Sequence, residues 1–148
     1  NEPEYEQWLR WAVDLHEVGL SIAHNQFNKH GAYLVQHSDM PGFSKQIQSN
    51  ISLMIRHQRK KAVISELEDR SKSSRNAIMR LTILLRLAIL FHQGRGLDKI
   101  IEPKVKVSKY QIEMQFPDGY VKNHPMTVLS LEAEKLLLSD ACYELTYQ

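Results

Sequence analysis

Residues 11–43 of this chain read WAVDLHEVGLSIAHNQFNKHGAYLVQHSDMPGF, and the rest of the sequence is arranged around this stretch. It contains four of the seven histidines and ends in a Pro-Gly turn. Gly19 follows the adjacent pair His16 and Glu17, where a helix ending near Glu17 would place a left-handed C′ residue. Apolar side chains recur at helical spacing up to this pair, at Tyr5, Trp8, Ala12, Leu15 and Val18. The pattern predicts a buried helix that ends in a histidine and a carboxylate.

Working outward, we expect five helices before residue 96, and several have a recognisable start or stop. Ser44 is a suitable N-cap for the third helix, which ends in the basic run that begins at Arg56. Gly94 and Gly96 stop the last helix, which is apolar around most of its circumference and therefore predicted to be central. The last helix is expected over residues 75–93, and the three remaining helices are expected over residues 3–17, 29–36 and 65–70.

Beyond Pro103 the apolar residues alternate with polar ones, which is typical of strands. The alternation predicts a hairpin that turns near Ser108, and a third strand over Tyr143–Tyr147. Pro125 is suited to begin a helix between them, with Val128, Leu131, Leu136 and Leu137 as its apolar positions. The predicted fold is therefore mainly α, with a helical domain over 1–96 and a small α+β unit over 97–148 that carries a short antiparallel sheet.

Composition sets the broad class of the protein. The 148 residues are 43% hydrophobic, enough to bury a proper core. Cys142 is the single cysteine, so no disulfide forms within the chain, and this usage suits a reducing compartment such as the cytoplasm. The most apolar stretch, residues 81–91, contains Arg86 and is too short to span a membrane. The chain begins at Asn1 without an initiator Met, so we expect it to be a piece of a longer protein.

The net charge of +2 hides an uneven distribution of charge along the chain. Residues 1–55 carry 3 Lys and Arg against 6 Asp and Glu, a balance of −3. Residues 56–109 carry 14 against 5, a balance of +9, and residues 110–148 carry 2 against 6, a balance of −4. A concentrated positive segment favours an anionic partner, although lysines on solvated faces are equally ordinary.

Five blocks of sequence, in this order and at these spacings, resemble the C-terminal region of the exopolyphosphatase and guanosine-pentaphosphate phosphohydrolase family. They lie within residues 8–91 and read LHEVGLSI (15–22), KHGAYL (29–34), SDMPGF (38–43), RHQRK (56–60) and LLRLAILF (84–91). The resemblance implies an HD-like helical bundle followed by an α+β tail, serving as a polyphosphate-channel and dimerisation module.

The same resemblance implies that the catalytic site lies elsewhere in the full-length enzyme. Two N-terminal actin-like domains would hold the catalytic carboxylates, a phosphate-binding loop and a divalent metal such as magnesium. The reaction would be removal of terminal phosphate from polyphosphate by a homodimer. The alternative within the family is removal of the γ-phosphate from guanosine pentaphosphate. A competing class is an autonomous metal-dependent HD phosphohydrolase acting on nucleotides.

That competing class depends on a metal site, for which His16 and Glu17 are the candidates, with His30 and His57 as further ligands. A catalytic metal needs imidazoles and carboxylates that converge from several helices. By the resemblance, Arg86 stands where an HD enzyme has its late Asp, and an arginine repels a cation. We therefore expect no metal centre here, and expect His16 to be a hydrogen-bonded, partly buried residue at its helix end.

A second cluster of residues is suited to a chain of phosphates. Lys and Arg supply positive charge and hydrogen-bond donors, and Arg forks onto phosphate oxygens. The resemblance assigns this cluster to polyphosphate binding, although it is equally compatible with a solvated helix end. Nucleic acid is not expected, because no helix-turn-helix pattern, zinc spacing or aromatic platform is present. The predicted polyphosphate-binding residues are Lys29, His30, Arg56, His57, Arg59, Lys60 and Lys61.

Overall fold

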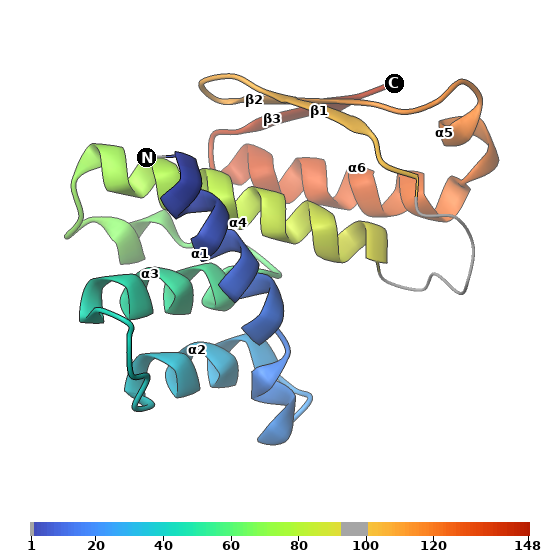
Figure 1. Ribbon diagram of the computed structural model, residues 1–148. Coiled ribbons are helices and arrows are strands. Elements are labelled where there is room, and N and C mark those ends of the chain that lie inside the picture. Colours follow the sequence, from blue (N-terminus) through green and yellow to red (C-terminus); the bar gives the residue numbers. More distant parts are fainter. Residues whose placement is uncertain (1, 93–100) are drawn as a thin grey trace. The chain divides into compact units, whose positions relative to one another are not determined.

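The computed structural model describes residues 2–92 and 101–148 (Figure 1). The chain divides into two compact units, Asn1–Ala88 and Ile89–Gln148. The predicted boundary at residue 96, with the stops at Gly94 and Gly96, lies outside the described residues. The mainly α class with a small α+β unit is confirmed. No helix in the described part of the chain combines the length and the apolar character that crossing a bilayer requires.

The first unit contains three complete α-helices, two short 3-10 helices and most of a fourth α-helix, whose last four residues belong to the second unit. α3 packs against both α1 and α2, and the first 3-10 helix packs against α2. The buried core includes Ala12 from α1, Ile51 and Ile55 from α3, and Leu85 from α4. The elements are α1 (Glu2–Leu15), η1 (Val18–Ser21), α2 (Phe27–His37), α3 (Lys45–Arg56), η2 (Ile64–Leu67) and α4 (Lys72–His92).

The turn between α2 and α3 forms as predicted. Phe43 donates its backbone N–H to Met40 O at 3.1 Å, and Gly42 has a φ of +90°, as a turn with Pro41 and Gly42 at its centre requires. The Ser44 hydroxyl oxygen then accepts the N–H of Ile47 at 3.1 Å and caps α3. The local sequence therefore determines both the turn and the start of α3.

The prediction for Gly19 was wrong, because this residue lies within η1 and has no positive φ. The reason for a glycine is close packing. A Cβ atom added here would lie 1.9 Å from the carbonyl oxygen of Phe27 and 2.5 Å from the amide nitrogen of Gly31. The backbone of η1 therefore lies directly against the backbone of α2, which no larger residue permits.

Side chains cap the helices of the first unit across the packing interfaces. Gln48 of α3 is buried, and its Nε2 donates to Val35 O at 2.6 Å and to Ser38 O at 2.7 Å, at the end of α2. Asn28 of α2 donates in turn to Arg56 O at 2.7 Å, at the end of α3. Each of these two helices therefore satisfies carbonyl groups that the other leaves without a partner at its C-terminus.

The second unit is a three-stranded sheet with helices between its second and third strands (Figure 1). β1 runs antiparallel to β2, with Val105 opposite Met114, as the predicted hairpin requires. β3 is parallel to β2, with Leu145 opposite Ile112, so the prediction of an antiparallel sheet was wrong for this strand. The elements are β1 (Lys104–Val107), β2 (Gln111–Gln115), α5 (Tyr120–Asn123), α6 (Pro125–Asp140) and β3 (Glu144–Tyr147).

The parallel pairing follows from the connection between the strands. A parallel partner needs a crossover, and α5 with α6 supplies it. α6 begins at Pro125 as predicted, but Leu136 is 73% exposed and does not face the core. Leu131, one of the predicted apolar positions, is buried together with Glu134 and Leu138, and Val128 and Leu137 are half-buried. The predicted apolar face is therefore correct at Leu131 and wrong at Leu136, and it lacked the buried Glu134.

Candidate functional site: a basic pocket at the end of α3

The predicted metal candidates do not gather into a site. His16 follows the end of α1, is half-buried, and has its Nδ1 2.5 Å from Val13 O. Its Nε2 lies 3.8 Å from Glu17 Oε1, and the Glu17 side chain is exposed. Across residues 2–92 and 101–148, no three His, Cys, Asp or Glu side chains are grouped so that they could hold a metal ion. The geometry of His16 is that of a helix-end histidine bonded to its own backbone.

Six of the seven predicted polyphosphate-binding residues line one pocket with a volume of about 220 Å³. His30 does not line it, and is half-buried in α2. The remaining lining residues are Gln26, Asn28, Val63 and Glu66. The predicted residues in the lining are Lys29, Arg56, His57, Arg59, Lys60 and Lys61.

The pocket is built on the C-terminal end of α3, whose carbonyl groups are held by side chains from other elements. Asn28 binds Arg56 O, and the buried Arg86 of α4 donates its Nη1 to His57 O at 2.8 Å. Gln58 donates its Nε2 to His16 O at 2.7 Å, which joins this turn to the end of α1. Arg86 thus has a structural role in fixing the backbone beneath the pocket.

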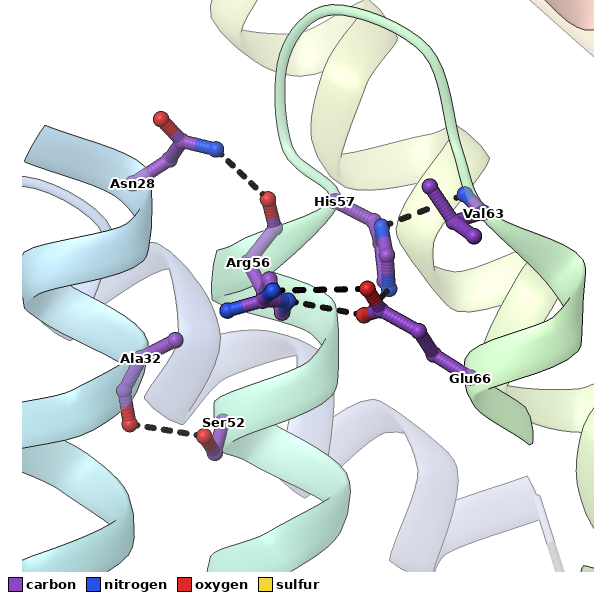
Figure 2. A network of polar contacts seen from close by, with 7 residues as sticks. All are labelled: Asn28, Ala32, Ser52, Arg56, His57, Val63 and Glu66. Carbon is purple, nitrogen blue, oxygen red and sulfur yellow. Dashed lines mark hydrogen bonds and ion pairs between the residues drawn. The ribbon is translucent and has the colours of Figure 1, made fainter. Parts of the chain in front are cut away.

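Glu66, in η2, is the one acidic residue that lines this pocket. Its carboxylate accepts from Arg56 Nε at 2.7 Å and from Arg56 Nη2 at 3.3 Å, a forked ion pair (Figure 2). Burial alone would raise the pKa of Glu66, but the hydrogen bonds and charge of Arg56, with a smaller effect of His57, hold the pKa below its usual value. The pocket therefore contains a negative charge among its cations at neutral pH.

His57 is buried and lies beside the Glu66 carboxylate of this ion pair (Figure 2). Its Nδ1 accepts the N–H of Val63 at 3.5 Å, and its Nε2 lies 3.1 Å from Glu66 Oε2. Burial lowers the pKa of His57, and the positive charges of Arg56 and Arg86 add to this effect against the opposing effect of Glu66. His57 is therefore neutral at pH 7 and does not add a positive charge to the pocket.

The other cations have different environments. The Arg59 guanidinium lies over the ring of Phe27, 4.9 Å from its centroid, a cation–π contact that fixes its direction. Lys29 and Lys60 are exposed, and Lys60 has a φ of +59°. Such a backbone angle is uncommon for a lysine, and it turns the chain sharply after the end of α3. These cations line the same pocket as the Arg56–Glu66 pair.

Sequence reasoning identified the basic residues of the pocket but missed Glu66, Asn28 and Arg86 in their structural roles. Glu66 is the first acidic residue after the basic run, which is a weak signal by itself. Nothing in the sequence places Asn28 next to a residue 28 positions away. These contacts depend on tertiary packing, which local patterns do not encode.

Comparison with known proteins identifies the family. The model of the Ppx/GppA phosphatase family, domain III, matches residues 1–135. Guanosine-5'-triphosphate,3'-diphosphate pyrophosphatase from Vibrio cholerae serotype O1, in both the classical Ogawa and the El Tor Inaba strains, is 31% identical over the whole chain. The chain spans 29% of the length of these relatives. The resemblance of the five sequence blocks is thereby confirmed, and the chain belongs to the Ppx/GppA phosphatase family.

Proposed function

We propose that the basic pocket at the end of α3 binds a chain of phosphates, and that the whole protein removes terminal phosphate from polyphosphate. The observation that supports this most directly is the convergence of Lys29, from α2, with the cations that end α3 on one pocket. Several closely spaced positive charges suit a polyanion, because each phosphate is neutralised without sequence or shape readout. The predicted residues other than His30 contribute to this lining.

The rest of the reaction belongs to other parts of the protein in this proposal. The chain spans less than a third of the length of its relatives. We therefore place the catalytic carboxylates and the divalent metal, such as magnesium, in N-terminal actin-like domains of the same protein. Domain III would then guide long substrates toward that site, as a module of a homodimer. We propose that these 148 residues bind substrate and do not contain the catalytic site.

The test is a binding titration of the chain with long-chain polyphosphate at several salt concentrations. Affinity is expected to fall steeply as salt rises, because phosphate neutralisation releases bound counterions. Replacing Arg59, Lys60 and Lys61 together by Ala is expected to weaken binding by on the order of 1–3 kcal/mol.

The matched control replaces Lys104, Lys106 and Lys109, which are exposed and equally basic but belong to the other compact unit. Equal weakening by the two triple variants would mean diffuse attraction to positive charge, and the proposal of a binding pocket would fail. Absence of any polyphosphate binding would refute the proposal outright.

A second candidate substrate is guanosine pentaphosphate, which is favoured by the name of the Vibrio cholerae relatives. The same pocket would then bind the phosphates of this nucleotide. Competition distinguishes the two: guanosine pentaphosphate that displaces labelled polyphosphate at low concentration favours the second candidate. Displacement only at concentrations at which inorganic triphosphate also competes favours polyphosphate.

A further inference from the structure

The pocket at the end of α3 contains its own anion. Glu66 binds Arg56 through both of the guanidinium nitrogens that face it, at 2.7 and 3.3 Å, and lies 3.1 Å from His57 Nε2. These are the nitrogens through which an arginine forks onto a phosphate, because carboxylate and phosphate oxygens have similar spacing. Arg56 therefore already has an occupant where a phosphate would bind.

The two partners in this ion pair have different backbone supports, although their side chains are similarly exposed, 38% for Arg56 and 33% for Glu66. The backbone of Arg56 is fixed by Asn28, and the next residue is fixed by Arg86. Glu66 lies on a 3-10 helix of four residues, with a side chain that is 33% exposed. A rotation of the Glu66 side chain toward solvent would free Arg56 without any change in the backbone.

We propose that Glu66 is a built-in competitor for the phosphate chain, which must displace its carboxylate from Arg56 in order to bind fully. This inference rests on the proposed function of the pocket, and assigns to Glu66 the selection of ligands by charge. A ligand with many phosphates gains contacts at Lys29, Lys60 and Arg59 that offset the loss of the Arg56–Glu66 pair. A single phosphate does not gain enough contacts, so the pocket favours long chains over orthophosphate.

The charge of Glu66 persists at neutral pH, as the proposal requires. The contacts with Arg56 hold the pKa of Glu66 below its usual value, so the carboxylate is ionised wherever the protein is folded and near neutral pH. Its negative charge therefore opposes every anion that enters the pocket. Replacing it by an amide of the same shape removes the charge and retains an oxygen that accepts from Arg56.

The experiment compares polyphosphate affinities of the unchanged chain, Glu66→Gln and Glu68→Gln. Glu68 is exposed, two residues further along, and absent from the pocket lining, so its replacement makes the same change in net charge. Glu66→Gln is expected to bind long-chain polyphosphate about tenfold more tightly and to bind orthophosphate measurably. Glu68→Gln is expected to bind as the unchanged chain does.

Each other outcome overturns the inference in a recognisable way. Equal gains in both variants would assign the effect to net charge, and weaker binding by Glu66→Gln would mean that Glu66 positions Arg56 for the phosphate. Binding by the unchanged chain with no change in Glu66→Gln would refute the competitor while leaving the proposed function intact. Failure of all three chains to bind would refute the proposed function as well.

A second measurement needs no variant that alters the pair. In a titration of the isotopically labelled chain with long-chain polyphosphate, the Arg56 Nε–H resonance reports on the partner of the guanidinium. We expect it to shift as the carboxylate is replaced by phosphate, with a matching change at the His57 ring. An unchanged Arg56 resonance at saturating polyphosphate would show that the pair stays intact, and would overturn the proposal.

Discussion

A single missing methyl group at Gly19 allows η1 to approach α2. The position of a Cβ atom here, 1.9 Å from Phe27 O, is far inside van der Waals contact with backbone atoms that a rotamer change does not move. Gly19→Ala is therefore expected to lower the free energy of unfolding by about 3 kcal/mol, at the upper end of the cost of overpacking. Urea denaturation of the purified variant measures this loss.

The control for this prediction is Gly42→Ala. Gly42 has a φ of +90°, but a Cβ atom there would have no neighbour within 4 Å. Backbone strain alone is expected to cost about 1 kcal/mol. A smaller loss for Gly19→Ala than for Gly42→Ala would contradict the close approach of η1 and α2.

For individual residues, the sequence predicts which residue types line the pocket better than it predicts their roles. The family resemblance predicted an anion site from Lys29, His30 and the basic run, and the structure brings six of the seven residues together. The helix-stop role of Gly19 was wrong because a glycine serves both positive φ and close packing, and these look alike in sequence. Glu66 was missed because its importance arises only from its distance to Arg56.

At the scale of elements, the antiparallel helices α2 and α3 depend on each other's polar side chains. Gln48 donates to carbonyl groups at the end of α2 from a site that is 1% exposed. Gln48→Met keeps a side chain of similar length but leaves those carbonyls without their side-chain donor. We expect the free energy of unfolding to fall by about 2 kcal/mol or more, measured by thermal or urea denaturation.

Gln46 provides the matched control for this prediction. It is exposed on the same helix, and its Nε2 donates to Asn50 at 3.1 Å. Gln46→Met is expected to change the stability by less than about 0.5 kcal/mol, as surface changes usually do. Similar losses for the two variants would mean that the helix propensity of methionine, and not the lost cap, decides the result.

Elements with local signals were predictable from the sequence, and elements that depend on distant partners were not. Three local signals each involve no more than four neighbouring residues, and the structure confirms all of them. They are the helix cap at Ser44, the helix start at Pro125 and the turn at Gly42. The alternation in Glu144–Tyr147 predicted a strand, but alternation is the same for parallel and antiparallel pairing. The direction of β3 is set by the crossover through α6, which a strand pattern does not reveal.

At the scale of the whole molecule, His57 couples folding to pH. Burial lowers the pKa of His57 from 6.5, and the charges of Arg56 and Arg86 add to this effect, although the charge of Glu66 opposes it. As the pH falls, His57 is therefore protonated in the unfolded chain before it is protonated in the folded chain. The stabilisation from a neutral His57 is complete above pH 6.5 and is lost as the pH falls below it. Glu66, whose folded pKa lies below 4.5, adds a second loss of stability at more acidic pH.

We therefore expect the free energy of unfolding to decrease from pH 7 toward pH 5, with a slope from His57 of at most about 1.4 kcal/mol per pH unit. In His57→Gln this part of the slope is expected to disappear, although the variant is less stable overall. His37→Gln, at an exposed position of α2, is expected to retain it. Urea denaturation at several pH values checks both, and an unchanged slope in His57→Gln would exclude His57 as the source.

The charge distribution of the chain takes a different meaning once the two units are known. The positive segment 56–109 looked like one basic region in sequence. Its densest part, Arg56–Lys61, belongs to the first compact unit, whereas Lys104, Lys106 and Lys109 belong to the second. Charge totals along a sequence do not show how folding divides the charges between surfaces.

The parallel pairing of β2 with β3 also sets an order of events during synthesis. The β1–β2 hairpin is local, but the second edge of β2 stays uncovered until residues 116–147 have followed it from the ribosome. At about 5–20 residues per second, this interval lasts a few seconds. During that time Ile112 and Met114 lie on a strand with an unpaired edge, which is the kind of segment that associates with other nascent chains. The second unit is therefore exposed to wrong strand pairing for this interval, until β3 covers the edge of β2.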